Sequence, residues 1–149
     1  MKSNILEKIT KYILDFMFFV GSFICLTVPV IFKFIGKVYN IYRFYYIQMC
    51  IMFMISGILA VLIIGELRKI FKTVLNNNCF VESNVKSLKK MGIFSMLIVF
   101  VTIIRLFYII TPTTLVIIIV FFIAGLFSFV LSKVFRQAVN YKIENDLTI

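Results

Sequence analysis

Side chains able to perform acid–base or nucleophilic chemistry are few in this sequence and are poorly placed for it. Histidine is absent, and no carboxylate lies deep inside the long apolar runs, since Asp15 and Glu66 fall at their edges. Cys25, Cys50 and Cys79 lack the CxxC or similar spacing of metal ligands and disulfide frameworks, and no base accompanies a nucleophile. The sequence therefore predicts that the protein is not an enzyme and that it holds no metal or other cofactor.

Arg105 is the one charged residue that lies well inside an apolar run. A basic side chain at the centre of a bilayer costs about 2.5–3.5 kcal/mol, so it needs an anionic partner or a route to the surface. Six residues separate it from Thr111, which corresponds to about 9 Å of helix rise. Arg105 can therefore extend to lipid headgroups, or it can serve as an internal site for an anionic ligand. The sequence leaves both interpretations open.

The elements that carry these residues are apolar helices. With 62% hydrophobic residues and a mean hydropathy of +1.09, the chain is unlike a soluble domain. Four apolar runs approach the roughly 20 residues that a membrane-crossing helix needs. We expect an all-α, polytopic membrane protein whose single four-helix domain covers residues 1–149, with an interfacial lead-in over 1–12. The predicted spans cover about 13–34, 47–65, 93–111 and 114–132.

Basic residues set the predicted orientation. The termini and the polar segment 66–92 together carry twelve of the sixteen basic residues, whereas the opposite side carries Lys33, Lys37 and Arg43. Because cytoplasmic loops are enriched in Lys and Arg, we expect both termini in the cytoplasm. The same rule accounts for the net charge of +10 without direct nucleic-acid binding. Basic and aromatic residues alternate over 33–46, which favours an interfacial aromatic belt over a single-strand binding site.

The segment 66–92 is predicted to be a helical hairpin beyond the membrane. Apolar residues at helical spacing continue the second span to Leu75, and Asn76–Asn78 suits the left-handed turn that ends a helix. A second apolar stripe from Val81 leads into the third span, and the tail 133–149 extends the fourth. Helices 2, 3 and 4 are therefore expected to extend into the cytoplasm. There they either pack on one another with their lysines on lipid headgroups, or form a docking platform for a cytosolic partner.

Small residues recur at helical spacing and predict close helix contacts. These seams contain Gly21, Ser22 and Cys25 in the first span, Ser56, Gly57 and Ala60 in the second, and Ala124, Ser128 and Ser132 in the fourth. They can join helices within one chain or form a homo-oligomer.

Two polar segments carry a family resemblance. Residues 78–88 read NCFVESNVKSL, and the chain closes with ENDLTI over 144–149. They resemble a family of small bacterial membrane proteins catalogued as domain of unknown function 2975. Its members typically show a Gly-Asn-Pro-Phe-Val turn, an Asn-Val-Lys-x-Leu helix and a terminal Glu-Asn-Asp-Leu-Thr. Here Asn77 replaces the glycine, which keeps the helix-ending role, and Cys79 replaces the proline, which makes the turn less rigid.

The resemblance implies four spans in the bacterial plasma membrane, no known enzymatic activity, and frequent pairing with a small helix-turn-helix transcriptional regulator encoded nearby. We therefore expect a regulatory membrane protein, in contact with lipids, whose cytoplasmic face docks such a regulator. The alternative is a small transporter, channel or self-immunity protein, with Arg105 as its intramembrane functional residue. The candidate partner-binding residues are those of the two motifs: Asn78, Phe80, Val81, Glu82, Asn84, Glu144, Asn145, Asp146, Leu147 and Thr148.

Overall fold

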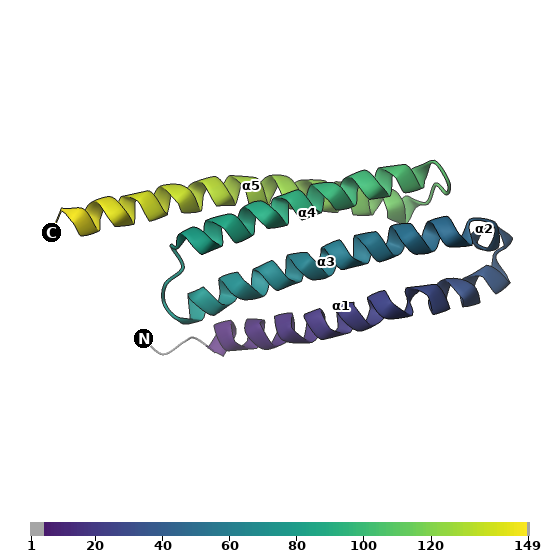
Figure 1. The fold of residues 1–149 in the computed structure, drawn as a ribbon, viewed down its shortest axis with the longest axis horizontal. Helices are drawn as coiled ribbons and strands as arrows, with labels where there is room; N and C mark the ends of the chain where they lie inside the picture. The colour runs from purple at the N-terminus through teal and green to yellow at the C-terminus, as the bar shows by residue number, and fades with distance from the viewer. Residues whose placement is uncertain (1–4, 149) are drawn as a thin grey trace.

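The protein is built of helices that run side by side along one long axis (Figure 1). The structure, a computed structural model, describes residues 5–148, so residues 1–4 and 149 of the predicted domain lie outside it. Its elements are α1 (Ile5–Val38), α2 (Asn40–Phe44), α3 (Tyr46–Leu75), α4 (Glu82–Leu106) and α5 (Pro112–Leu147). Four of these, α1, α3, α4 and α5, are long and apolar enough to cross a membrane, which confirms the all-α class and the four spans.

Two helix extensions agree with the apolar periodicity. Helix α3 continues without interruption from Tyr46 to Leu75, as the stripe beyond the second span predicts. Helix α5 also runs unbroken through the polar tail to Leu147. The short turn between α4 and α5 ends where the Thr111 hydroxyl accepts a hydrogen bond from the Thr114 N–H at 3.3 Å, with Pro112 in the first turn of the helix.

The structure differs from the prediction near the first span. The expected lead-in is continuous with the span, since α1 begins at Ile5 and continues past the expected end to Val38. The belt region also contains the short helix α2, which follows Tyr39 directly. Aromatic packing accounts for this compact turn, because the Tyr42 ring lies 6.0 Å from the Phe32 ring and 6.2 Å from the Tyr39 ring.

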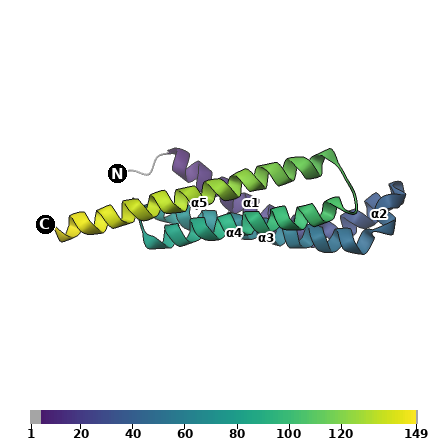
Figure 2. The same cartoon turned by 90° about the horizontal axis from the view of Figure 1, so that it is seen from above.

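The long helices pack in the order α1, α3, α4, α5, so each middle helix has two neighbours. Among the described residues, no Cα atom of α1 comes within 8 Å of one in α4 or α5. Figure 2 shows α5 displaced to one side of α3 and α4. The four long helices therefore form an open bundle. Residues of all four line one cavity of about 280 Å3.

Small residues allow close approach within both outer pairs. A Cβ atom built on Gly57 would lie 3.0 Å from the Cys25 sulfur, so the predicted seams of the first and second spans face each other within the chain. Between α4 and α5 the seam is shifted from the predicted one: Ser128 and Ser132 are buried, but Ala124 is exposed. Gly125 is the residue that meets α4, where a Cβ would lie 3.4 Å from the backbone oxygen of Gly92.

Candidate functional site

The turn between α3 and α4 contains a residue in the left-handed conformation. Asn77 has φ of 54°, and it is the one non-glycine residue with positive φ in the described chain. The backbone N–H of Asn78 donates to the backbone carbonyl of Thr73 at 3.0 Å, which closes the end of α3. This confirms the helix-ending role that the sequence assigns to the asparagines, at the position where the resembling family carries glycine.

Asn84 fixes this turn from within. Its side chain is 1% exposed, and its amide nitrogen donates to the Thr73 hydroxyl at 2.6 Å and to the Cys79 carbonyl at 2.7 Å. The two bonds join the end of α3, the connecting turn and the start of α4. Asn84 was a candidate partner-binding residue, but its amide is occupied inside the protein. It therefore supports the turn instead of presenting a surface.

Glu66 is a buried carboxylate between α3 and α4 that sequence reasoning placed only at the edge of a span. It is 8% exposed and accepts hydrogen bonds at 2.7 Å from the Ser87 hydroxyl and from the Lys69 ammonium. The Lys90 ammonium lies 4.0 Å away. Burial by itself raises the pKa of Glu66, but the hydrogen bonds from Lys69 and Ser87 and the charges of Lys69 and Lys90 outweigh it, so the pKa is lowered.

A second charged contact joins α1 to α3 at the same end of the molecule. The Arg68 Nε atom donates to the Asp15 carboxylate at 2.6 Å. The Arg68 guanidinium also lies 4.6 Å from the centre of the Phe18 ring. The sequence predicts neither contact, because helical periodicity within one helix does not reveal which residue of another helix lies opposite.

The exposed residues of the turn contact α5. The Phe80 ring lies 5.5 Å from the Phe135 ring, and the Glu82 carboxylate lies 3.6 Å from the Arg136 guanidinium. The Lys142 ammonium donates to the Asn78 side chain at 3.0 Å. Val81 is half-buried and precedes α4 in an extended conformation. Three of the candidate residues, Asn78, Phe80 and Glu82, thus form one surface at the junction of the turn with α5.

The second candidate motif projects away from this surface. Every residue from 140 to 148 is exposed, and α5 extends past the α3–α4 turn (Figure 1). The candidates there are Glu144, Asn145, Asp146, Leu147 and Thr148, and no recorded contact joins any of them to the described residues of the turn. The structure therefore keeps the two motifs near one end of the molecule but does not bring them into contact.

The Arg105 side chain extends toward the α4–α5 connection and is buried within the protein. It is 8% exposed, and its Nη2 atom donates to the Thr114 hydroxyl at 2.8 Å. The guanidinium lies 4.4 Å from the centre of the Phe53 ring of α3. The Thr114 and Thr111 hydroxyls share a further hydrogen bond of 2.7 Å. The side chain therefore extends toward the helix ends, as its distance from Thr111 suggests, but it is accommodated inside the protein beside a cavity of about 230 Å3.

These features define a multi-pass membrane protein with a polar, hydrogen-bonded end. The chain belongs to the family described as protein of unknown function (DUF2975), whose model matches residues 30–149. That match includes the turn, α4 and all of α5. No curated protein and no solved structure matches the chain.

The contact around Glu66 predicts a pH-dependent stability. A lowered pKa means that Glu66 stabilises the fold fully above its ordinary value of 4.5, and that this contribution is lost as the pH falls through the folded-state pKa. Glu66→Gln should lower the free energy of unfolding by about 1–3 kcal/mol near neutral pH. The difference from wild type should shrink as the pH falls through the folded-state pKa of Glu66, because both side chains are neutral below it. Thermal unfolding of the detergent-solubilised protein across this range measures both effects.

The matched control is Glu144→Gln, because Glu144 is an exposed carboxylate of α5. This control should unfold like wild type at every pH. A Glu66→Gln variant that also matches wild type near neutral pH would contradict the importance of the buried contact.

Proposed function

We propose that the protein is a non-enzymatic regulatory membrane protein whose polar end faces the cytoplasm and docks a small helix-turn-helix regulator. The observation that carries the proposal is the exposed end of α5. Residues 140–148 are all exposed. They continue an apolar stripe whose earlier residues pack against the rest of the protein. Phe135 of that stripe contacts Phe80, and Val139 is buried.

The stripe continues beyond its contacts with the turn. Ile143 and Leu147 follow Val139 at intervals of four residues, so the three lie on one face of the helix. Ile143 is 52% exposed and Leu147 is 80% exposed. An apolar face that extends beyond its last intramolecular contact suits an interaction with a second protein.

The charge of the same helix end supports a basic partner. Glu144 and Asp146 are exposed and lie beside the apolar pair. Proteins that bind DNA concentrate Lys and Arg on the surface that faces the phosphates. A carboxylate pair beside an apolar anchor complements such a surface. Docking would then compete with DNA for the regulator and hold it at the membrane.

Substitutions in the α5 end test this docking. The full-length protein in detergent is titrated with a purified small helix-turn-helix regulator of the kind that the family resemblance implies. Ile143→Ser with Leu147→Ser should weaken binding about 100-fold, since two aliphatic side chains lose their burial. Glu144→Gln with Asp146→Asn should weaken it too, and should reduce its salt dependence. Tyr141→Ser is the control, because Tyr141 is 71% exposed on the same helix end but lies off the stripe.

Two outcomes would contradict the docking proposal. The first is a wild-type protein that does not bind the regulator. The second is a loss of affinity in Tyr141→Ser as large as that in the stripe variant, since this would indicate a general effect on the helix end.

The proposed orientation can be tested with a native thiol. Cys79 lies in the α3–α4 turn and is partly exposed, whereas Cys25 and Cys50 are buried in the apolar helices. A membrane-impermeant maleimide should label Cys79 in inside-out vesicles but not in intact cells. Cys79→Ser gives the background signal. Labelling of Cys79 in intact cells would place the polar end outside and contradict the orientation.

The cavity beside Arg105 favours a second function, that of a small transporter or channel or a self-immunity protein. This alternative predicts chloride uptake into proteoliposomes that carry wild type or Arg105→Lys. Arg105→Leu, which removes the charge, should reduce uptake by at least about 30-fold. Uptake no greater than in protein-free liposomes, or unchanged uptake in a correctly inserted Arg105→Leu variant, would exclude Arg105 as a transport site.

A further inference from the structure

The end of the molecule opposite the α3–α4 turn carries positive charges without any carboxylate. Its cations are Lys33 and Lys37 in α1, Arg43 in α2 and Arg105 near the end of α4. The acidic residues are six in number, and none lies between positions 15 and 66 or between 82 and 144. All six therefore belong to the helix ends beside the α3–α4 turn and the two termini (Figure 1). The cations at the other end have no internal counter-charge.

The chain turns sharply here and brings three of these cations around one space. Lys33 and Lys37 are separated by one helical turn and lie on the same side of α1. Gly36, between them, is buried, and a Cβ built on it would lie 3.5 Å from the backbone nitrogen of Arg43. The missing side chain at Gly36 lets α2 fold back against the end of α1. Arg43 is thereby held across from the two lysines.

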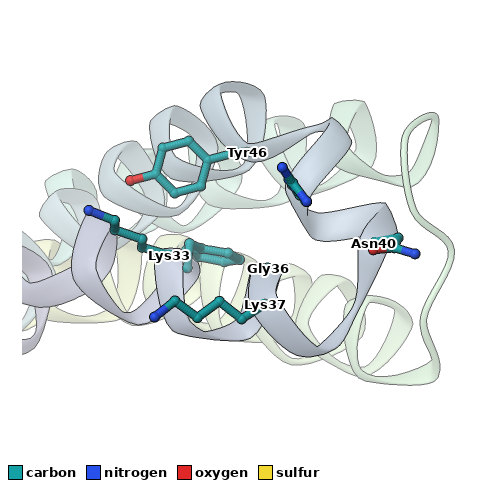
Figure 3. Close-up of a pocket in the computed structure, with 7 residues that line it drawn as sticks. Lys33, Gly36, Lys37, Asn40 and Tyr46 are labelled. Carbon is teal, nitrogen blue, oxygen red and sulfur yellow. The ribbon is translucent and has the colours of Figure 1, made fainter.

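A cavity of about 680 Å3 lies between the end of α1, helix α2 and the first turn of α3. Its polar lining consists of Lys33, Lys37, Asn40, Arg43 and Tyr46, and Phe32 is among its apolar residues. Figure 3 shows the ends of the Lys33, Lys37 and Tyr46 side chains extending to the same side, whereas Asn40 points the other way.

The three cations of this cavity have no anionic partner among the described residues. Among the described residues, Lys33 and Arg43 make no recorded hydrogen bond or ion pair, and the recorded contact of Lys37 is with the Phe34 ring at 5.2 Å. The Tyr46 hydroxyl donates to the Pro29 carbonyl at 3.0 Å, which fixes its ring at the wall of the cavity. Three like charges around one space repel one another unless an anion lies between them.

The surroundings also suit an acyl chain. A second cavity of about 660 Å3 adjoins the first and shares Phe32 with it. Apolar residues of α1 line it, among them Ile24, Val28 and Ile31. A cationic cavity beside an apolar groove matches a molecule with a charged head and a hydrocarbon tail.

We propose that this cavity binds a phosphate group. The Lys33 and Lys37 ammonium groups neutralise its charge, and the Arg43 guanidinium donates paired hydrogen bonds to two phosphate oxygens. The phosphate comes either from the headgroup of an anionic phospholipid, whose chain would occupy the adjoining groove, or from a soluble phosphate. The site is separate from the proposed docking surface at the opposite end of the helices.

Binding by the full-length protein tests the proposal. The protein is reconstituted in phosphatidylcholine nanodiscs with or without phosphatidylglycerol, and bound lipid is counted by native mass spectrometry. A parallel arm titrates inorganic phosphate in phosphatidylcholine nanodiscs by calorimetry. The site variant carries Lys33→Gln, Lys37→Gln and Arg43→Gln. The charge-matched control carries three exposed lysines changed at the other end: Lys86→Gln, Lys89→Gln and Lys133→Gln.

Wild type and the control should bind phosphatidylglycerol or phosphate saturably, and the site variant should bind about 100-fold more weakly. Binding of phosphatidylglycerol alone identifies a lipid headgroup, and binding of inorganic phosphate identifies a soluble ligand. The separate double variant Lys33→Arg with Lys37→Arg keeps both positive charges and should retain most of the wild-type affinity. This variant also separates loss of the site from loss of the fold.

Equal losses in the site variant and in the charge-matched control would overturn the proposal, because binding would then follow net charge alone. Absence of saturable binding to either probe by wild type would overturn it as well.

Discussion

The polar end of the protein depends on the buried carboxylate of Glu66. In lipid the hydrophobic effect does not drive helices together, so interhelical hydrogen bonds and close packing fix one helix against another. The hydrogen bond from Ser87 to Glu66 sets the register between α3 and α4, and Lys69 and Lys90 balance the charge. Asn84 then ties the turn to α3 through Thr73. These contacts make the turn a fixed support for the exposed residues Asn78, Phe80 and Glu82.

The two ends of the molecule differ in how their charges are balanced. At the turn, carboxylates meet cations within the protein, as Asp15 meets Arg68 and Glu82 meets Arg136. At the other end the cations of α1 and α2 meet none. In a membrane protein with so little extramembrane chain, each end offers a different chemistry to what surrounds it. One end suits a protein with a basic surface, and the other suits a phosphate.

Periodicity and local turn chemistry made much of this fold predictable. The stripe through Leu75 located the end of α3, and the tolerance of asparagine for positive φ located the turn at Asn77. Contacts between helices were beyond such reasoning. Nothing in the sequence pairs Glu66 with Ser87, or shows that Gly125, and not Ala124, faces α4. Helix α2 was missed because a five-residue helix stabilised by aromatic packing on Phe32 has no period of its own.

The central claim is that a rigid turn stands beside an exposed end of α5, residues 143–147. Hydrogen exchange measured by mass spectrometry on the isolated full-length protein tests it most directly. The account predicts slow exchange at the backbone amides of 67–75 and 83–92, which the Glu66 and Asn84 contacts hold, and fast exchange over 143–147. Equally fast exchange in the turn helices and in the α5 end, or strong protection over 143–147 without a partner, would contradict it.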